Sequence, residues 1–401
     1  MTLPFIDTSS PSGPPKPAAG INLRALLEEM VSRNASDLHI VAGEKPKLRV
    51  DGDITNATAE YELNPKDTLQ LAYSVLTEQQ KKRFELEDEL DFSFGIQNLA
   101  RFRGNVFKQR GCVSMVVRQI PFAIKTFDQL GLPGSIAKMA EKPRGLVLVT
   151  GPTGSGKSTT LAAMIDKINR ERKGHIITVE DPIEFIHKHQ SCIINQREIG
   201  SDTKSFANAL KYALREDPDI ILVGEMRDLE TIAATLTIAE TGHLAFATLH
   251  TNSAAEAINR IIDVFPSHQQ SQVRAQLAFV LEGIVTQTLL PKASGRGRVM
   301  AAEILVVTPA IRALIRDDKV HQIYSSMQAG KKFGMQTLND ALYQLYMARE
   351  VTAEECLRVS GDPTEFQRMI GQLPTDDDGS GKPGGAKPAT ARPGAGSPAR
   401  R

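Results

Sequence analysis

Gly151-Pro-Thr-Gly-Ser-Gly-Lys-Ser158 is the stretch of sequence that decides the fold. It matches G-x-x-x-x-G-K-[ST], the pattern of a phosphate-binding loop (P-loop) that a strand precedes and a helix follows. The apolar run at 146–149 supplies the strand, and residues 158–172 supply a helix with an apolar stripe at Leu161, Met164 and Ile168. The loop therefore has the context of a nucleotide site rather than that of an ordinary glycine-rich turn.

Phosphate binding explains why the loop contains glycines, a lysine and a serine. Backbone amides must turn inward to wrap phosphates, and a Cβ at the glycines would obstruct that path. Lys157 offers a point charge to the β- and γ-phosphates, and Ser158 offers a hydroxyl to Mg²⁺. ATP and Mg²⁺ are thus the predicted cofactors. The predicted ATP-binding residues are Gly151, Pro152, Thr153, Gly154, Ser155, Gly156, Lys157, Ser158 and Thr159.

The chain around the loop has the rhythm of a parallel α/β sheet covered on both faces. Short apolar strands are expected at 146–149, 176–179, 220–223 and 244–248, with helical segments between them. Beyond Pro266 we expect mostly helix up to about Gly371, most clearly at 310–316 and 338–347.

The N-terminal part mixes strands and helices without a βαβ rhythm, which indicates a small α+β domain. Helices are expected at 21–31 and 68–84, and strands at 38–41, 48–50, 92–94, 101–107 and 114–120. We predict a disordered arm at 1–20, this domain at 21–122, a linker at 123–134, an ATPase domain at 135–371 that is helical from about 267, and a disordered Pro/Gly-rich tail at 372–401.

Carboxylates follow two of the expected parallel strands. Glu225 ends an apolar strand, as the Walker B carboxylate of a P-loop ATPase should, and Glu180, Asp181 and Glu184 follow the strand at 176–179. Each alone could be a helix cap or a surface charge. Because carboxyl ends of parallel strands share one sheet edge, we interpret them together as the groups that hold Mg²⁺ and position a water for hydrolysis.

The histidines and arginines near the expected strands each have two possible roles. His250 follows the strand at 244–248, so we interpret it as a γ-phosphate sensor, with a structural histidine as the alternative. Arg101 and Arg103 point to one face of an expected strand, and Arg118 lies in another. They could form a solvated sheet face or act as arginine fingers on a neighbouring subunit's γ-phosphate.

Net charge, cysteine content and hydropathy exclude several classes of protein. A net charge of +1 argues against a protein that grips nucleic acid through bulk electrostatics. Cys112, Cys192 and Cys356 are too few and too scattered for a four-cysteine zinc site or a disulfide framework. Because neither a signal peptide nor a membrane-spanning run is visible, we expect a cytoplasmic protein without direct membrane insertion.

The motif order resembles the secretion-type ATPases of bacterial type II secretion and type IV pili, over about residues 21–371. The resemblance rests on Gly151–Thr160, Thr178–Phe185, Arg215–Asp228 and Glu240–Thr251. Within that family the chain is most similar to the pilus retraction ATPases. Three stretches carry this: Ser36-Asp-Leu-His39 with Asp51-Gly52, Ala310-Ile-Arg-Ala-Leu-Ile-Arg316, and Gly334-Met-Gln-Thr-Leu338. The absence of a four-cysteine zinc element argues against the extension and secretion motors of the family.

The resemblance implies a PAS-like N-terminal domain, a RecA-like core and a homohexamer that drives pilus retraction and twitching motility. It implies an inner-membrane platform protein as partner at the pilus base, and a second retraction ATPase. An accessory retraction ATPase and a RecA-like nucleic-acid motor remain the alternatives. An ATP-gated protein without hydrolysis is a third, although the carboxylates for hydrolysis are all present.

The resemblance also implies roles for individual residues, which fall into four groups. They are an Asp box of Glu180, Asp181 and Glu184; a His box of His243 and His250; trans arginines Arg103 and Arg118; and a retraction motif of Ala310, Ile311, Arg312, Leu314, Ile315 and Arg316. With the carboxylates above, the candidate catalytic residues are Glu225, Glu180, Glu184 and His250. The candidate Mg²⁺ contacts are Ser158 and, through water, Glu225.

Overall fold

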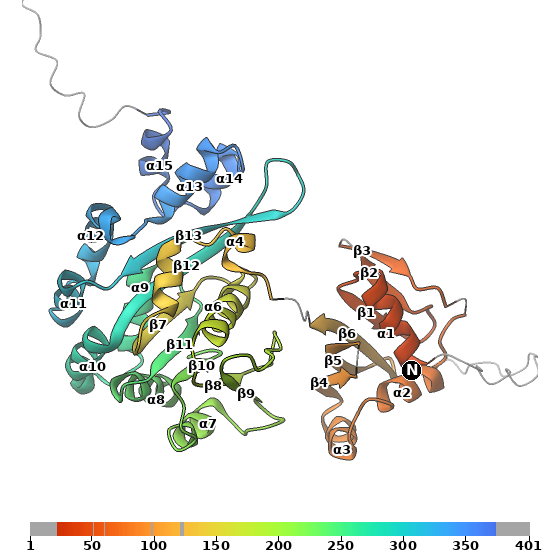
Figure 1. Cartoon of the computed structure of the whole chain (residues 1–401). Helices are drawn as coiled ribbons and strands as arrows, with labels where there is room; N and C mark the ends of the chain where they lie inside the picture. Colours follow the sequence, from red (N-terminus) through yellow and green to blue (C-terminus); the bar gives the residue numbers. More distant parts are fainter. Residues whose placement is uncertain (1–21, 51, 60, 98, 121–123, 374–401) are drawn as a thin grey trace, which may run out of the picture. The chain divides into compact units, whose positions relative to one another are not determined.

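The computed structural model describes residues 22–50, 52–59, 61–97, 99–120 and 124–373 (Figure 1). The expected arm at 1–20 and most of the expected tail at 372–401 lie outside the described residues. Contacts divide the chain into two compact units. The first comprises the chain up to Thr288 together with Glu303–Gln336, and the second comprises Leu289–Ala302 with the chain from Thr337 onward.

The N-terminal sheet has six antiparallel strands in the order β3-β2-β1-β6-β5-β4. The strands are β1 (Asp37–Ile40), β2 (Lys47–Val50), β3 (Asp53–Asn56), β4 (Glu89–Ile96), β5 (Ala100–Gln109) and β6 (Cys112–Ile120). Buried residues of the strands, among them Leu38, Phe102 and Val117, form a core with Leu27 and Met30 of helix α1 (Leu23–Ser32). The five predicted strands of this region are confirmed, and β3 was not predicted.

The helix expected at 68–84 is wrong, because the structure has two helices there, α2 (Pro65–Tyr73) and α3 (Glu78–Glu87). Thr77 begins the second with a capping box, in which its hydroxyl accepts the N–H of Gln80 while the Gln80 side chain accepts the N–H of Thr77. Such a reciprocal cap stabilises a new helix start and ends any continuous pattern through it.

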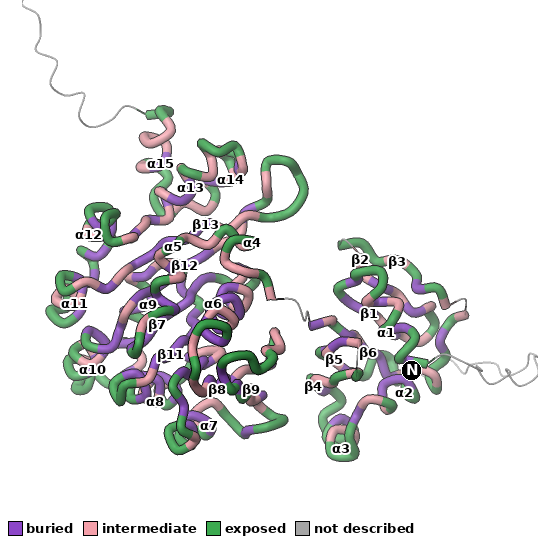
Figure 2. The backbone as a smooth tube through the Cα atoms, viewed as in Figure 1, coloured by how far each residue is buried: buried purple, intermediate pink, exposed green. Residues whose placement is uncertain are grey.

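The second sheet has seven strands in the order β13-β12-β7-β11-β10-β8-β9, and neighbours from β12 to β9 run parallel. The strands are β7 (Gly145–Thr150), β8 (His175–Glu180), β9 (Ile193–Glu198), β10 (Ile220–Val223), β11 (Leu244–Leu249), β12 (Leu281–Pro291) and β13 (Arg298–Val306). All residues of β7, β10 and β11 are buried (Figure 2). Helices cover these strands, which explains their continuous apolar runs and confirms the predicted α/β class.

Helices α6 (Lys157–Glu171) and α8 (Leu229–Glu240) both pack against β7. The remaining helices of this unit are α4 (Phe127–Leu130), α5 (Gly134–Ala140), α7 (Phe206–Ala213), α9 (Ala254–Asp263), α10 (Ser267–Val280), α11 (Pro309–Arg316) and α12 (Ile323–Ala329). In the second unit, α13 (Leu338–Met347), α14 (Ala353–Val359) and α15 (Pro363–Met369) form a small core around Leu342, Cys356 and Phe366. No helix in the described ranges is long and apolar enough to span a bilayer.

The expectation of mostly helix beyond residue 267 is wrong for 281–306, where β12 and β13 complete the sheet. The run Ile284-Val-Thr286 is β-branched, a composition that favours strands, and β12 finds a buried place beside β7. Short apolar runs cannot be assigned to helix or strand by periodicity alone.

Candidate active site

The P-loop connects β7 to α6, and its glycines have the backbone conformation that the loop requires. Gly151, Gly154 and Gly156 have φ of 136°, 78° and 91°, which residues with a Cβ rarely adopt. A Cβ on Gly151 would also overlap the backbone carbonyl oxygen of Gln287 in β12. The loop therefore packs tightly against the neighbouring strand and leads its amides into the N-terminus of α6, a ready anion site.

Lys157 is fixed by the loop itself. Its Nζ donates to the carbonyl oxygens of Gly151 at 2.8 Å and Pro152 at 3.1 Å. An ammonium has three donors, so one remains for a phosphate oxygen. Burial lowers the pKa of Lys157, while the charges of Glu225 and Glu184 act against that shift. Both carboxylates are thus close enough to the lysine for their charges to influence it.

Glu225 follows β10 and lies beside Arg227 and His250. Its Oε1 accepts from Nε of Arg227 at 2.6 Å and lies 3.3 Å from Nε2 of His250. Burial alone would raise the pKa of Glu225, but Arg227 and His250 together lower it below its usual value. The carboxylate stays ionised at neutral pH. With the Ser158 hydroxyl it provides the oxygen donors that Mg²⁺ prefers, so these residues fit a magnesium ion.

Glu180 ends β8 and has a different environment. Its Oε1 accepts from the Thr178 hydroxyl at 2.6 Å and from Nε2 of Gln196 at 3.2 Å. Burial raises the pKa of Glu180 to about 7, more than these hydrogen bonds lower it, and the charge of Glu184 raises it further. A carboxylate with a pKa near the working pH is suited to accept a proton from water.

Gly224 lets the ends of β8 and β10 approach. A Cβ there would lie 3.1 Å from both the Cα of Glu180 and the carbonyl oxygen of Val179. The predicted catalytic residues Glu225, Glu180 and His250 all follow the carboxyl ends of parallel strands, at the edge of the sheet that carries the P-loop. Ligands of open α/β sheets bind at this edge.

His243 stands apart from these residues, since it precedes β11 whereas His250 follows it. Seven steps along the extended chain, from residue 243 to residue 250, separate the two by about 23 Å at 3.3 Å per step. Nδ1 of His243 contacts the Ile238 carbonyl at 3.2 Å and the Thr241 hydroxyl at 3.1 Å, which holds the turn after α8. His243 therefore does not reach the P-loop of its own chain.

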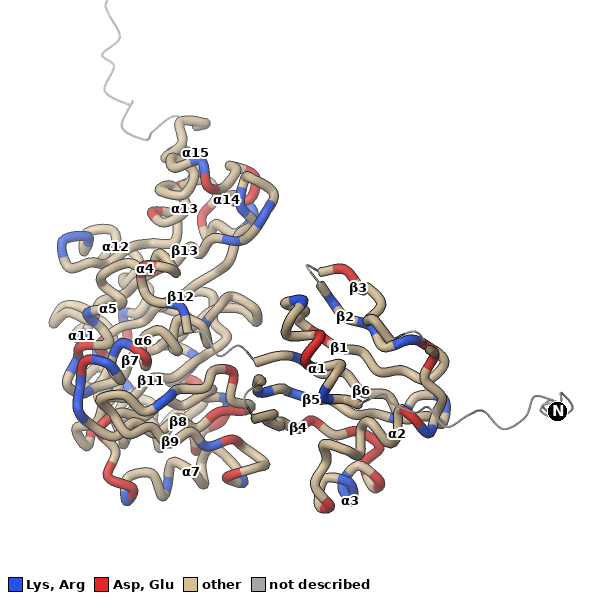
Figure 3. The backbone as a smooth tube through the Cα atoms, turned by 45° about the vertical axis from the view of Figure 1, so that its right-hand side comes forward, with Lys and Arg blue, Asp and Glu red and all other residues tan. Residues whose placement is uncertain are grey.

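The predicted trans arginines belong to a row of side chains that crosses five strands of the N-terminal sheet. Strand register places Ser93, Arg103, Arg118, Asp37 and Arg49 opposite one another in that order. We call these five residues the arginine row; Figure 3 marks the basic and acidic positions along the chain.

The arginine row carries more positive than negative charge. Asp37 is 4% exposed, and its carboxylate accepts from Nε of Arg118 at 2.8 Å and lies 3.9 Å from Arg49. Arg103 pairs with Asp91 at 3.5 Å. Like charges opposite each other repel, so the acidic partners are needed to hold Arg103 and Arg118 in adjacent strands.

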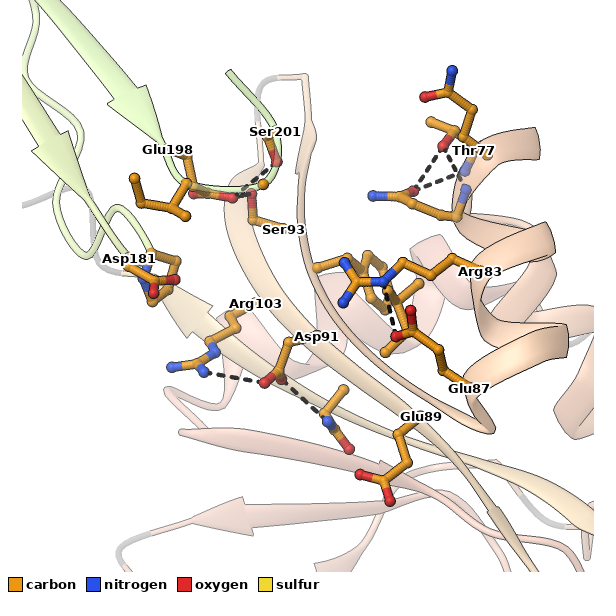
Figure 4. Close-up of a pocket in the computed structure, with 18 residues that line it drawn as sticks. Thr77, Arg83, Glu87, Glu89, Asp91, Ser93, Arg103, Asp181, Glu198 and Ser201 are labelled. Carbon is orange, nitrogen blue, oxygen red and sulfur yellow. Dashed lines mark hydrogen bonds and ion pairs between the residues drawn. The ribbon is translucent and has the colours of Figure 1, made fainter. Parts of the chain in front are cut away.

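A pocket of about 830 Å³ lies in the first unit and is drawn in Figure 4. Residues of β4 and β5 line it, including Arg103, and so do Asp181 and Pro182 of the Asp box segment. Glu198 in β9 accepts from the Ser93 hydroxyl at 2.6 Å and from Arg101 at 3.2 Å. Arg101 is thus a structural ion-pair partner, which the interpretation as a two-arginine cluster with Arg103 missed.

The retraction motif forms α11 and separates into buried and exposed parts. Ile311 and Ile315 are fully buried in the core, whereas Arg316 is exposed. Arg312 donates to the carbonyls of Ala278 and Phe279 at the end of α10, at 2.6 and 2.7 Å, and pairs with Glu282. Half of the motif therefore holds the fold together.

Sequence reasoning missed the residues that support the P-loop from β12. The hydroxyls of Thr286 and Thr150 share a buried hydrogen bond of 2.8 Å, and Nε2 of Gln287 donates to the Ser155 carbonyl at 2.8 Å. A strand assignment at 281–291 would have placed them beside β7. Within the described ranges, no group of three or more His, Cys, Asp or Glu residues could hold a metal ion by itself.

Comparisons with known proteins agree with this geometry. The model of the family described as type II/IV secretion system protein matches residues 18–358. The chain is 49% identical to the type IV pilus retraction ATPase PilT of Pseudomonas aeruginosa, over 86% of this chain and 100% of that protein. It is 44% identical to the type IV pilus ATPase PilU of the same organism, over 86% and 90%. The crystal structure of the pilus retraction motor PilT with bound ADP superposes with a TM-score of 0.83 at 51% identity, over 87% of this chain and 100% of that chain.

Proposed function

The chain belongs to the type II/IV secretion system protein family and is an ATPase, and from that premise we propose that it powers the retraction of type IV pili. Hydrolysis of Mg-ATP would drive the removal of pilin subunits from the pilus base and hence twitching motility. The observation that carries the proposal is the 49% identity to a retraction ATPase over that protein's full length. The complete P-loop and carboxylate site supports it.

The residues of the site divide the chemistry among them. The loop amides and Lys157 bind the phosphates, and the Ser158 hydroxyl is the contact for Mg²⁺. Mg²⁺, when bound, neutralises charge on the β- and γ-phosphates. Glu225 orients the water or a water ligand of Mg²⁺. Glu180 accepts a proton from the attacking water, since its pKa is raised to about 7. Glu184 and His250 adjust the charge around these two groups.

The proposed assembly is a homohexamer in which nucleotide lies at subunit interfaces. The arginine row supports this, because Arg118 keeps 68% of its side chain exposed although Asp37 fixes its position. Such an arginine can contact a phosphate held by another subunit. Mixing an Arg118→Ala variant with a Lys157→Ala variant tests the arrangement. Activity restored in mixed rings supports an arginine that acts in trans, and mixtures that stay inactive contradict it.

Further parts of the proposal come from the family. The N-terminal domain is PAS-like and the second sheet belongs to a RecA-like core; ATP binding and hydrolysis close and reopen the cleft between them. An inner-membrane platform protein receives the motion, and the chain acts peripherally at the pilus base. Co-purification of the platform protein with the chain, dependent on nucleotide, is the measurement for the partner.

Deletion of the gene tests the function as a whole. Cells that still assemble pili, in greater number, but no longer twitch would support a retraction ATPase. Absent pili would indicate an extension motor, and normal twitching would overturn the proposal. Retraction that persists with reduced force would identify the accessory role suggested by the 44% identity to PilU. Reintroducing the Lys157→Ala variant is the matched control, which should not restore twitching.

A further inference from the structure

Gln287 lies in β12, beside the strand that leads into the P-loop, and none of the roles above uses it. Its side chain is 2% exposed, and its Nε2 donates to the backbone carbonyl of Ser155, in the middle of the loop, at 2.8 Å. We propose that Gln287 is a positioning residue that sets the orientation of a P-loop amide and thereby the affinity for the nucleotide's phosphates.

The geometry of one peptide group carries the argument. In a trans peptide the C=O and the following N–H point in opposite directions. The peptide that joins Ser155 to Gly156 has its carbonyl directed at Gln287, so the N–H of Gly156 points away from β12. Gly156 is the N-cap of α6, where free amides collect around an anion. Holding the carbonyl therefore directs an amide toward the phosphates.

The strand and the loop are joined at two further points. The hydroxyls of Thr286 and Thr150 share a buried hydrogen bond, and these residues are register partners in β12 and β7. Gly151 packs so closely on the Gln287 carbonyl oxygen that a Cβ would not fit. The backbone of β12 at Gln287 is thus fixed relative to the loop, so its amide group reaches Ser155 without freedom to drift.

A role in packing alone does not explain a glutamine here. Oε1 of Gln287 is buried and has no hydrogen-bond partner among the described residues, and the same holds for the Ser155 hydroxyl. A buried acceptor without a partner costs stability, which an apolar side chain of the same length would avoid. The glutamine keeps the Ser155 carbonyl satisfied in the loop conformation that binds phosphate.

The test replaces the donor and keeps the size. Gln287→Met removes the hydrogen bond at nearly the same length. We expect it to lower the affinities for Mg-ADP and for a non-hydrolysable ATP analogue by the same factor. That factor is roughly 5 to 15, as the loss of one buried hydrogen bond implies. The rate at saturating ATP should change less than threefold. The unfolding midpoint without nucleotide should change little, because the variant removes one unpaired buried acceptor, Oε1 of Gln287, and leaves another, the Ser155 carbonyl. Thr288→Val, one residue along β12, is the matched control and should leave affinity unchanged.

A second variant gives a readout that packing would not change. In Gln287→Glu the new carboxyl can donate to the Ser155 carbonyl only when protonated, and its ionised form repels that oxygen. Nucleotide affinity relative to the parent chain should therefore fall as the pH rises from 5.5 to 8.5. Because the readout is the pH profile of one folded variant, divided by that of the parent chain, it decides the question even if Gln287→Met does not fold. Affinities of Gln287→Met within twofold of the parent, or a flat pH profile of Gln287→Glu, would overturn the proposal.

Discussion

The half-buried carboxyl of Glu180 leads to a pH-dependent change in stability that a single substitution should remove. Its pKa rises from 4.5 in an exposed carboxyl to about 7 in the folded protein. A group whose pKa is raised by folding contributes stability below pH 4.5 that is lost as the pH rises through about 7. Glu180→Gln stays neutral at every pH and can still accept from Thr178 and Gln196.

The size of the effect follows from the shift. About 2.5 pKa units at 1.36 kcal/mol each give about 3 kcal/mol at pH 8, and less than about 1 kcal/mol at pH 5. Unliganded Glu180→Gln should therefore be more stable than the parent chain by about 3 kcal/mol at pH 8 and nearly equal at pH 5. Denaturant unfolding at both pH values measures this.

The exposed carboxylate variant Glu62→Gln serves as control, since it removes one charge without a change in burial. Its stability should follow that of the parent chain at both pH values. If Glu180→Gln also runs parallel to the parent between pH 5 and pH 8, the carboxyl is not desolvated as described. The assignment of Glu180 as a base with a pKa near 7 would then fail.

Three further predictions address the other parts of the site. Lys157→Ala should lower the affinity for nucleotide by at least about tenfold in a direct binding assay, because the charge-assisted contact of the lysine with phosphate is lost. Glu225→Ala should still bind ATP but turn it over at least 100-fold more slowly; turnover close to normal would contradict its catalytic role. Ile315→Ala should destabilise the protein by about 2–5 kcal/mol through a core cavity, whereas Leu314→Ala should leave ATPase activity intact and abolish twitching. Normal twitching of cells that carry Leu314→Ala would show that the exposed side of α11 has no role in pilus retraction.

The candidate nucleotide site could be proposed from the sequence because its determinants are local. The P-loop pattern and the apolar runs before Glu180, Glu225 and His250 are read directly from neighbouring residues, and parallel strands bring their ends to one edge. The family resemblance predicted an ATPase of this class, which the comparisons confirm.

What the sequence missed depends on contacts between distant segments. Strand register places Arg103 opposite Arg118 and Arg118 opposite Asp37. These neighbours cannot be known before the register is fixed. Gln287 contacts Ser155 across 132 positions of chain, and no short-range pattern marks it. The contacts of α11 are likewise not marked in the sequence, so the predicted retraction motif includes Ile311 and Ile315 although both belong to the core.

In the homohexamer proposed above, the arginine row would have a consequence for the contact between neighbouring copies of the chain. Arg103, Arg118 and Arg49 against Asp37 leave a charge of +2 on the row (three minus one), or +1 with Asp91 included. At physiological ionic strength so small a charge is screened within about 8 Å. The row therefore cannot attract a phosphate from a distance and responds only on near contact. In the proposed assembly, the row would contact a phosphate in an adjacent site that is both filled and closed. It would not contact one in a site that is filled but open.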